Sequence, residues 1–377
     1  MKIAVLTESA GAERRVAATP EAVKRYLGLG AELFVQAGAG EASRYPDAQY
    51  AEVGAKVEKS AAAVVKDADV VLTVGRPDPA ALAGAAKGAL VIGVMDPYGH
   101  KDEIAALAAT GATVFAMELM PRITRAQVMD VLSSQANLAG YQAVIDAAEV
   151  YDRAMPMMMT AAGTIPAAKA FVMGAGVAGL QAIATARRLG AAVSATDVRP
   201  AAKEQVESLG AKFIAVEDEE FKAAETAGGY AKEMSKEYQA KQAELVAGHI
   251  AKQDIVVTTA LIPGRPAPRL VSKAMLQSMR PGAVVVDLAV ERGGNVEGAV
   301  AGEVVEVEGV TIIGHVNVAS RIPSTASALY ARNLHAFVET LVDKESKAIK
   351  VDFDDDLVKA TLLTRDGSVV HPMFAEG

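Results

Sequence analysis

One stretch near the middle of the chain constrains the fold more than any other. Residues 169–197 combine a buried-type strand, a glycine-rich turn, a helix with an apolar face and a second strand that ends on Asp197. Gly174, Gly176 and Gly179 have the GxGxxG spacing, which permits a tight turn, close approach of a pyrophosphate and close packing of helix on strand. Together these features predict a dinucleotide-binding β-α-β unit rather than a structural glycine-rich turn.

The acid at the end of the second strand indicates which dinucleotide is bound. Asp197 is placed to accept hydrogen bonds from the hydroxyls of an adenosine ribose, whereas a 2′-phosphate would meet its negative charge. Arg199 favours the opposite choice, NADP(H), because an arginine just past this strand can accept a 2′-phosphate. With the acid in place we expect NAD(H) rather than NADP(H), and we expect Arg199 to be solvated.

Composition limits the other function classes. The chain has 377 residues and a net charge of −8, without a basic stripe, which argues against nucleic acid as a partner. It has no cysteine, which excludes disulfides, thiolate nucleophiles and cysteine-based metal sites. No HxxxH spacing or carboxylate cluster predicts another metal site. Prolines, glycines and Lys169 interrupt the apolar segment from Met155 to Ala186, so no membrane span is expected.

Short apolar runs alternate with helical stretches in both halves of the chain. This pattern is typical of parallel sheets covered on both faces. The expected class is α/β, with two doubly wound, Rossmann-like domains linked by long helices at Thr124–Asp146 and Ser327–Leu341. The first domain is expected at residues 1–135 plus 320–377, and the nucleotide-binding domain at 136–319. The expected strands are Lys2–Thr7, Glu32–Gln36, Val70–Val74, Leu90–Val94, Thr113–Met117, Ala168–Met173, Ala192–Thr196, Lys212–Val216, Ile255–Thr259, Ala283–Leu288 and Thr311–Gly314.

A long connection in the second domain predicts a mobile loop near residues 218–236. It contains paired glycines and one aromatic residue, Tyr230. Long loops in compact domains are commonly functional. We expect a lid with Tyr230 at its tip, the alternative being an idle surface loop.

A group of polar residues lies where the first domain leads into the linking helix. Gln127, Asp130 and Ser134 have i, i+3 and i+7 spacing and would share a helix face, with Ser133 beside them. Arg122 precedes them and could bind a pyrophosphate with its bidentate guanidinium. This face is either a ligand-orienting site or a solvated helix surface.

Several segments resemble a known family over nearly the whole chain. They are similar to the NAD(H)-binding alpha subunit, of the alpha-1 type, of proton-translocating nicotinamide nucleotide transhydrogenase. The segments are PRITRAQVMDVLSSQANLAGYQAV (121–144), MMMTAAGTIPAAKAFVMGAGVAGLQAIATARRLGA (157–191), ATDVRPAAKEQVESLGAKF (195–213), AETAGGYAKEM (224–234), TTALIPGRPAP (258–268) and DLAVERGGN (287–295).

The resemblance implies roles for particular residues. Direct hydride transfer would be positioned, without acid or base, by Gln127, Asp130 and Arg122. The segment Met155–Ala161 would form part of an arm in a homodimer, the alternative being buried core. The residues implied to bind NAD(H) are Arg122, Gln127, Asp130, Ser133, Gly174, Gly176, Val177, Gly179, Asp197, Val198, Tyr230, Ala260 and Leu261, with Met234 in the mobile loop.

The resemblance also implies partners and a place in the cell. NADP(H) would be bound on a partner subunit, and proton movement would occur in separate membrane-spanning subunits. The chain itself, without a span, would be cytoplasmic and attached to the inner membrane through those partners.

Two other functions stay open at this point. Alanine dehydrogenases are similar in both domains, and Arg15 corresponds to the arginine with which they bind the substrate carboxylate. Where they carry a substrate lysine this chain has the segment Thr73–Pro77, and where they carry a catalytic histidine it has Asp96. Amino-acid oxidation must move a proton as well as a hydride, so these differences disfavour it. The third possibility is an NAD(H)-binding regulatory subunit without catalysis of its own.

Overall fold

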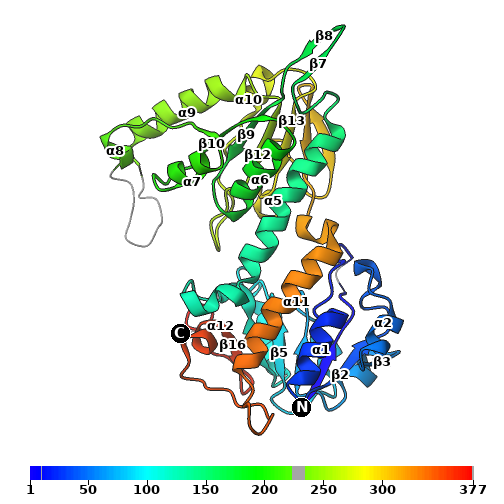
Figure 1. Cartoon of the computed structure of the whole chain (residues 1–377). Coiled ribbons are helices and arrows are strands. Elements are labelled where there is room, and N and C mark those ends of the chain that lie inside the picture. The colour runs from blue at the N-terminus through cyan, green and yellow to red at the C-terminus, as the bar shows by residue number, and fades with distance from the viewer. Residues whose placement is uncertain (10, 223–233, 376–377) are drawn as a thin grey trace. The chain divides into compact units, whose positions relative to one another are not determined.

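The chain forms two compact units, each built around one mostly parallel sheet (Figure 1). Unit 1 consists of Met1–Gln135 and Ala319–Gly377, and unit 2 consists of Ala136–Val318. Two parallel-sheet α/β units confirm the predicted fold class. The computed structural model describes residues 1–9, 11–222 and 234–375.

The eight-stranded sheet of unit 1 has helices on both faces. Its order is β17-β16-β6-β5-β4-β1-β2-β3, parallel except where β16 pairs with β6 and β17. Side chains alternate between the faces of a strand. In β1, Ile3 and Val5 join a core cluster with α1 and α11, whereas Ala4, together with Leu6 just after the strand, joins a second cluster with α3 and α4. The strands are β1 (Lys2–Val5), β2 (Glu32–Gln36), β3 (Lys56–Glu58), β4 (Val70–Leu72), β5 (Leu90–Gly93), β6 (Thr113–Ala116), β16 (Leu362–Arg365) and β17 (Ser368–Val369).

The helices of unit 1 are mostly short. Two of them, α11 and α12, come from the last part of the chain, which returns to this unit. They are α1 (Pro20–Gly28), η1 (Glu41–Ser43), α2 (Asp47–Glu52), α3 (Ala61–Val65), η2 (Pro79–Leu82), α4 (Lys101–Ala109), η3 (Met117–Leu119), η4 (Thr124–Met129), η6 (Val318–Arg321), α11 (Pro323–Thr340) and α12 (Asp356–Thr361).

Unit 2 repeats this plan with a seven-stranded sheet of order β11-β10-β9-β12-β13-β15-β14, in which only the β14–β15 pair is antiparallel. Ala170 and Val172 face one core cluster, and Phe171 and Met173 face the other. The main strands are β9 (Lys169–Met173), β10 (Ala192–Thr196), β11 (Lys212–Phe213), β12 (Ile255–Thr258), β13 (Val284–Asp287), β14 (Val304–Val307) and β15 (Val310–Ile313). The helices are α5 (Val131–Val150), which begins in unit 1, α6 (Val177–Arg188), α7 (Ala202–Ser208), α8 (Glu219–Lys222), α9 (Lys236–Ile250), α10 (Lys273–Ser278) and η5 (Val290–Arg292).

Each sheet has a point at which the strand order reverses. In unit 1 the chain runs from β1 outward through β2 and β3, then crosses to β4 on the other side of β1. In unit 2 it runs from β9 through β10 and β11, then crosses to β12 on the other side of β9. Ligands of open α/β sheets bind outside the carboxyl ends of the strands at such points.

The predicted continuous helix over Thr124–Asp146 is wrong. A 3-10 segment, η4, ends at Met129, Asp130 has extended backbone with ψ of 90°, and α5 begins at Val131. The break has a chemical reason, because the Asp130 carboxylate accepts hydrogen bonds from Ser133 N (2.8 Å) and Ser133 Oγ (2.6 Å) and so caps α5. Gln127, Asp130 and Ser134 therefore do not share one helix face.

Beyond Met155, the methionine-rich segment is exposed rather than buried core. It contributes a separate two-stranded hairpin, β7 (Met158–Thr160) and β8 (Gly163–Ile165), in which Met159 is 78% exposed. The neighbouring Met157 is also exposed, whereas Met155 is buried.

Along the part of the chain that the structure describes, no helix combines the length and the apolar character needed to cross a bilayer.

Candidate functional site

The glycine turn of unit 2 has the geometry that its spacing predicts. Gly174 follows β9 with φ of +108°, a conformation that other residues rarely adopt. A Cβ on Gly179 would lie 1.8 Å from the Gly174 carbonyl oxygen, so only glycine permits this contact between helix and strand. The turn leads directly into the twelve residues of α6, whose N-terminus favours negative charge.

Asp197 lies beside this turn, at the carboxyl end of β10. Its Oδ2 accepts a hydrogen bond from Ala175 N at 2.7 Å, which ties the end of this strand to the turn that follows β9. The Arg199 guanidinium donates to both carboxylate oxygens, through Nε at 2.9 Å and Nη2 at 3.0 Å, and this pairing raises the pKa of Arg199. The expectation that Arg199 is merely solvated is therefore wrong.

Apolar side chains from three loops stand exposed around the turn. Val177 begins α6, Val198 follows Asp197 and is 64% exposed, and Leu261 and Ile262 follow β12. These loops leave the adjacent strands β9, β10 and β12 at the carboxyl edge of the sheet. Exposed apolar residues around a phosphate-type turn are typical of a surface that takes a flat aromatic ring.

A buried asparagine fixes the loop after β12. Asn295 is fully buried, accepts a hydrogen bond from Ala260 N (3.0 Å) and donates to Ala260 O (2.9 Å) and Pro268 O (2.8 Å). Sequence spacing assigns Asn295 no role, although this residue ends the segment 287–295. A polar residue after a pair of glycines was the only signal.

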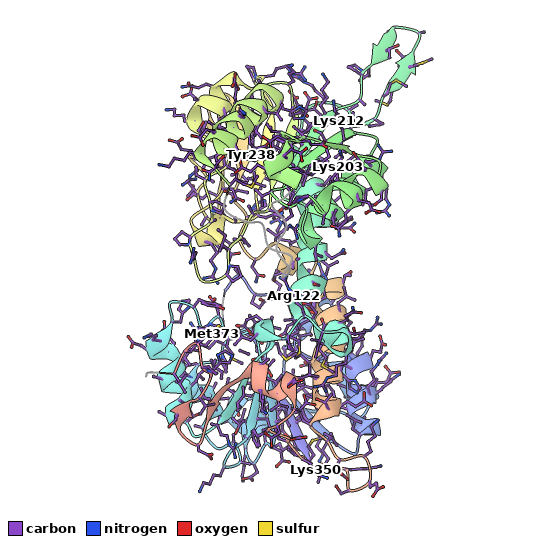
Figure 2. All side chains as sticks on the ribbon, turned by 90° about the vertical axis from the view of Figure 1, so that its left-hand side faces the viewer. Arg122, Lys203, Lys212, Tyr238, Lys350 and Met373 are labelled. Atoms are coloured by element: carbon purple, nitrogen blue, oxygen red, sulfur yellow. The ribbon has the colours of Figure 1, made fainter. Side chains whose placement is uncertain are left out.

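Unit 1 gathers a second group of the predicted residues. Arg122, labelled in Figure 2, and Gln127 are exposed, and Asp130 is partly buried. All three line one surface pocket of about 210 Å³, together with Pro121, Ile123, Thr124 and Ala126. Ser133 lies at the edge of this group through its hydrogen bonds to Asp130.

Residues from the end of the chain hold this segment in place. Asn333 on α11 donates to Val128 O (2.8 Å) and accepts from Ser134 Oγ (2.7 Å), so it ties η4 to the start of α5. Arg125 forms a bidentate pair with Asp355, at 2.7 and 2.8 Å. Asn333 and Asp355 lie about 200 residues or more from their partners, which is why sequence spacing could not find them.

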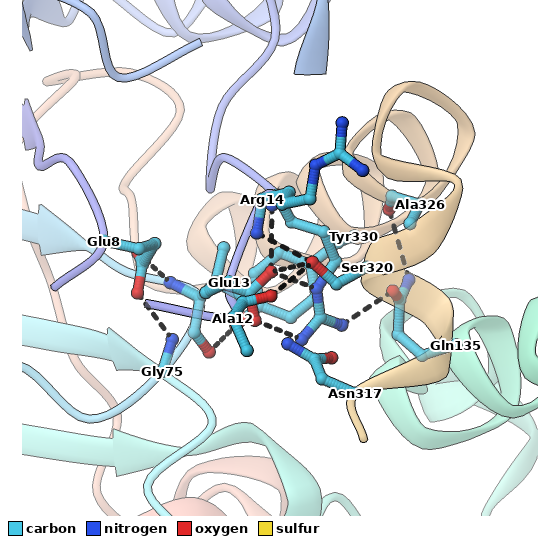
Figure 3. A network of polar contacts seen from close by, with 12 residues as sticks. Glu8, Ala12, Glu13, Arg14, Gly75, Gln135, Asn317, Ser320, Ala326 and Tyr330 are labelled. Carbon is cyan, nitrogen blue, oxygen red and sulfur yellow. Dashed lines mark hydrogen bonds and ion pairs between the residues drawn. The ribbon is translucent and has the colours of Figure 1, made fainter. Parts of the chain in front are cut away.

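At the carboxyl edge of the unit 1 sheet, Arg15 is paired with Glu13 and Gln135, both of which are labelled in Figure 3. Its Nε and Nη2 donate to Glu13 at 2.8 and 2.7 Å, and its Nη1 donates to Gln135 Oε1 at 2.8 Å. Arg76 donates to the backbone carbonyls of Met95 (2.7 Å) and Asp96 (3.1 Å).

Two glutamates at the same edge bridge neighbouring strand ends. Glu8 accepts from Val74 N (2.6 Å) and Gly75 N (3.0 Å), and Glu118 accepts from Met95 N (2.8 Å) and Asp96 N. Burial raises the pKa of each carboxyl to about 7, against the opposing effect of the backbone hydrogen bonds.

The predicted site residues thus fall into two groups. Unit 2 brings together Gly174, Gly176, Val177, Gly179, Asp197, Val198, Ala260 and Leu261 at one sheet edge. Unit 1 brings together Arg122, Gln127, Asp130 and Ser133. Tyr230 and most of the predicted mobile loop lie outside the described residues. Within the described residues, no group of three or more His, Asp or Glu side chains has the arrangement of a metal site.

Comparisons with known proteins place this geometry in a family. One relative, the first portion of the NAD(P) transhydrogenase alpha subunit of Rhodospirillum rubrum, is 52% identical over 377 residues, which cover 99% of this chain and 98% of the relative. A crystal structure of transhydrogenase from Sinorhizobium meliloti is 64% identical, covers 98% of this chain and 100% of that one, and superposes with a TM-score of 0.90. An alanine dehydrogenase of Halomonas elongata is 27% identical, over 100% of this chain and 96% of the relative.

Two family descriptions match the chain almost from end to end. "Alanine dehydrogenase/PNT, N-terminal domain" matches residues 4–139, and "Alanine dehydrogenase/PNT, C-terminal domain" matches residues 143–372. With the glycine turn, the acid that follows it and the two parallel-sheet units, the chain belongs to the alanine dehydrogenase/PNT family.

Proposed function

We propose that this chain is the NAD(H)-binding subunit of a proton-translocating transhydrogenase. In this proposal, hydride passes directly between NAD(H) on this chain and NADP(H) on a partner subunit. Membership of a dehydrogenase and transhydrogenase family implies a nicotinamide nucleotide as ligand. The name of the relative that is 52% identical supports the transhydrogenase reaction in particular.

The adenosine half of NAD(H) is assigned to unit 2. The glycine turn from Gly174 to Gly179 takes the pyrophosphate, because backbone N–H groups and the α6 dipole favour its charge. Asp197 takes the ribose hydroxyls. The adenine lies among the exposed apolar side chains, with Val177, Val198, Ala260 and Leu261 in contact with the adenosine.

The nicotinamide half is assigned to Arg122, Gln127, Asp130 and Ser133. These residues orient the ring and donate no proton. Tyr230, which lies outside the described residues, is assigned to nucleotide binding by the family resemblance alone. These assignments are supported by the shared pocket of three of the four residues in unit 1 and by the family resemblance of the segments that contain them.

The chemistry explains why orienting residues suffice. The hydride leaves C4 of the dihydronicotinamide with both electrons of its bond and joins C4 of the oxidised nicotinamide, and no proton is transferred. The reaction needs only two rings held at a near-attack distance of about 3–3.5 Å. Amino-acid oxidation also needs a group that accepts a proton.

The choice of hydride transfer over amino-acid oxidation is supported mainly by the residues at the carboxyl edge of the unit 1 sheet. Gly75 and Arg76 stand in the segment where alanine dehydrogenases carry a lysine, and Asp96 stands where they carry a histidine. Gly75 has no side chain, and Arg76 is bonded to backbone carbonyls. At these two positions the chain therefore offers no lysine or histidine for the proton transfer that amino-acid oxidation requires.

Partner proteins complete the proposed enzyme. The NADP(H) and the proton path belong to separate subunits, with which this chain is associated at the inner membrane. The exposed β7–β8 hairpin is assigned to a homodimer interface.

The test is hydride transfer from NADH to an oxidised NADP⁺ analogue by the purified chain, with and without an NADP(H)-binding partner subunit. NADH binding to the chain alone is measured in parallel by fluorescence. We expect NADH binding in both cases and transfer only with the partner.

Other outcomes discriminate the alternatives. NADH binding without transfer, even with the partner, would favour the regulatory subunit. Turnover of alanine with NAD⁺ by the chain alone would favour the amino-acid dehydrogenase.

A further inference from the structure

The Asp197 carboxylate is surrounded by more donors than a single structural contact requires. Four N–H groups converge on its two oxygens: Ala175 N (2.7 Å), Arg199 N (2.8 Å), Arg199 Nε (2.9 Å) and Arg199 Nη2 (3.0 Å). Two are backbone groups and two form the fork of a guanidinium. Four convergent N–H donors are typical of a site that binds an oxyanion, and here the bound oxyanion is the Asp197 carboxylate itself.

The surroundings show that the site is organised and accessible. The Asp197 side chain is only 7% exposed, whereas the Arg199 side chain is 35% exposed. The planar guanidinium matches a phosphate as well as a carboxylate, with two parallel N–H···O bonds. A phosphate in place of the carboxylate would meet the same four donors.

We propose that Ala175 and Arg199 form a latent 2′-phosphate site, which Asp197 fills with its own carboxylate. The pair then sets nucleotide choice: Asp197 excludes the 2′-phosphate of NADP(H), and Arg199 is the specificity-determining residue that would bind it once the carboxylate is removed. This inference rests on the proposed function, because it assumes that unit 2 binds an adenosine ribose at Asp197.

The charge of Asp197 decides whether a 2′-phosphate is repelled or bound. Asp197 and Arg199 together carry no net charge, so an arriving 2′-phosphate gains little from Arg199 and is repelled by Asp197. Without the carboxylate, the guanidinium is left partly buried and unpaired. A dianion that restores its hydrogen bonds is then favoured by a charge-assisted interaction, which corresponds to roughly tenfold or more in affinity.

The experiment compares two probes that differ only in the 2′-phosphate, 5′-AMP and 2′,5′-ADP. Their dissociation constants are measured by calorimetry on the full chain at fixed salt. We expect the wild type to prefer AMP, and Asp197→Ser to shift the AMP to 2′,5′-ADP affinity ratio toward 2′,5′-ADP by about tenfold or more. Asp197→Asn removes the charge but leaves little room, so its shift is in the same direction and smaller.

The double variant Asp197→Ser/Arg199→Gln tests the role of Arg199. It should lose the gained affinity for 2′,5′-ADP. The matched control is Asp197→Ser/Arg188→Gln, which removes an arginine from the last turn of α6 and should retain the gain.

The outcomes separate this inference from the function on which it rests. A gain that survives Arg199→Gln, or no gain in Asp197→Ser and Asp197→Asn when both still bind AMP, would overturn it. A wild-type chain that binds neither AMP nor NADH would instead overturn the proposed function.

Discussion

At the scale of single residues, the Asp130 carboxylate has two roles. It caps α5 through Ser133 N and Oγ, and it lines the unit 1 pocket with Gln127. A change at Asp130 therefore alters helix stability as well as any contact with nucleotide, and capping losses are typically about 1 kcal/mol. Gln127 is exposed and lies before the cap, so a change there tests the proposed orienting role without removing the cap.

The Gln127→Asn variant should slow hydride transfer while preserving binding. Shortening this side chain by one methylene moves its amide out of reach of a ring that must be held at near-attack distance. We expect transfer with the partner subunit to fall by about tenfold or more and the NADH dissociation constant to change by less than about threefold. Stopped-flow transfer and equilibrium binding measure the two quantities. Gln205→Asn, on the exposed surface of α7, is the control, and equal losses in rate and binding would contradict the orienting role.

The raised pKa of Glu118 makes the stability of unit 1 depend on pH near neutrality. Burial raises the pKa from 4.5 to about 7 in the folded state, so the folded state holds the proton more tightly than the unfolded chain. The free energy of unfolding should therefore fall as pH rises from about 4.5 to about 7, and change little from this group above that range.

Glu118→Gln tests this dependence. The neutral amide cannot ionise, so the variant should lack up to about 2–3 kcal/mol of the loss between pH 5 and pH 8. Urea midpoints at the two pH values measure it. Glu58→Gln, on the β2–β3 edge, is the control, and an unchanged pH dependence in Glu118→Gln would contradict the assignment.

At the scale of elements, α5 and α6 make a close contact next to the glycine turn. A Cβ on Gly140 of α5 would lie 2.0 Å from the carbonyl oxygen of Ala178, in the first turn of α6. The backbones of the two helices are thus in direct contact at the start of α6, which follows the glycine turn.

Gly140→Ala should force α5 away from α6. Overpacking of this kind costs about 1–3 kcal/mol, and displacement of the α6 N-terminus should also weaken AMP binding. Gly248→Ala is a matched control because it too is a helical glycine, and nothing lies within 4 Å of its added Cβ. The control should be neutral or stabilise by about 0.5–1 kcal/mol. Urea unfolding and AMP calorimetry compare the variants, and similar results for both would contradict the contact.

Much of this architecture could be predicted because it depends on local pattern. The runs Glu32–Gln36 and Ala192–Thr196 form strands over their whole predicted length, since continuous apolar β-type residues suit a sheet covered on both faces. The break at Asp130 could not be predicted from apolar spacing, because it depends on one side-chain hydrogen bond. Two strands could not be predicted from apolar runs either. β14 alternates exposed and partly buried residues, and β16 pairs with a strand more than 240 residues away.

The site divides in the same way. The GxGxxG turn and Asp197 could be predicted from spacing alone, because the motif contains its own geometry. Asn295, Asn333 and the pairing of Arg199 could not, since each depends on a partner that the fold supplies.

At the scale of the whole molecule, the β7–β8 hairpin is the feature that a single chain does not explain. A two-stranded hairpin is marginally stable in water without further packing. Met157, just before it, and Met159 within it are 62% and 78% exposed. Such a projection is consistent with the proposed homodimer.

Replacing these side chains should weaken self-association. We expect Met157→Ser/Met159→Ser to shift the chain from dimer toward monomer. Burial of apolar surface in an interface is favourable by about 25 cal/mol for each Å² removed from water, and the serines bury less of it. Light scattering over a dilution series measures the shift. Met373→Ser, a methionine 60% exposed in unit 1 (Figure 2), is the control. A dimer that persists unchanged in the double variant would contradict the hairpin interface.

The raised pKa values of Glu8 and Glu118 also affect the enthalpy that is measured when the protein unfolds. Glu8 and Glu118 both have a pKa of about 7 in the folded state, so unfolding between about pH 5 and pH 7 releases protons to the solution. The buffer takes up those protons with its own enthalpy of ionisation. Scanning calorimetry in phosphate and in an amine buffer at the same pH should therefore give different unfolding enthalpies, and the difference counts the protons released.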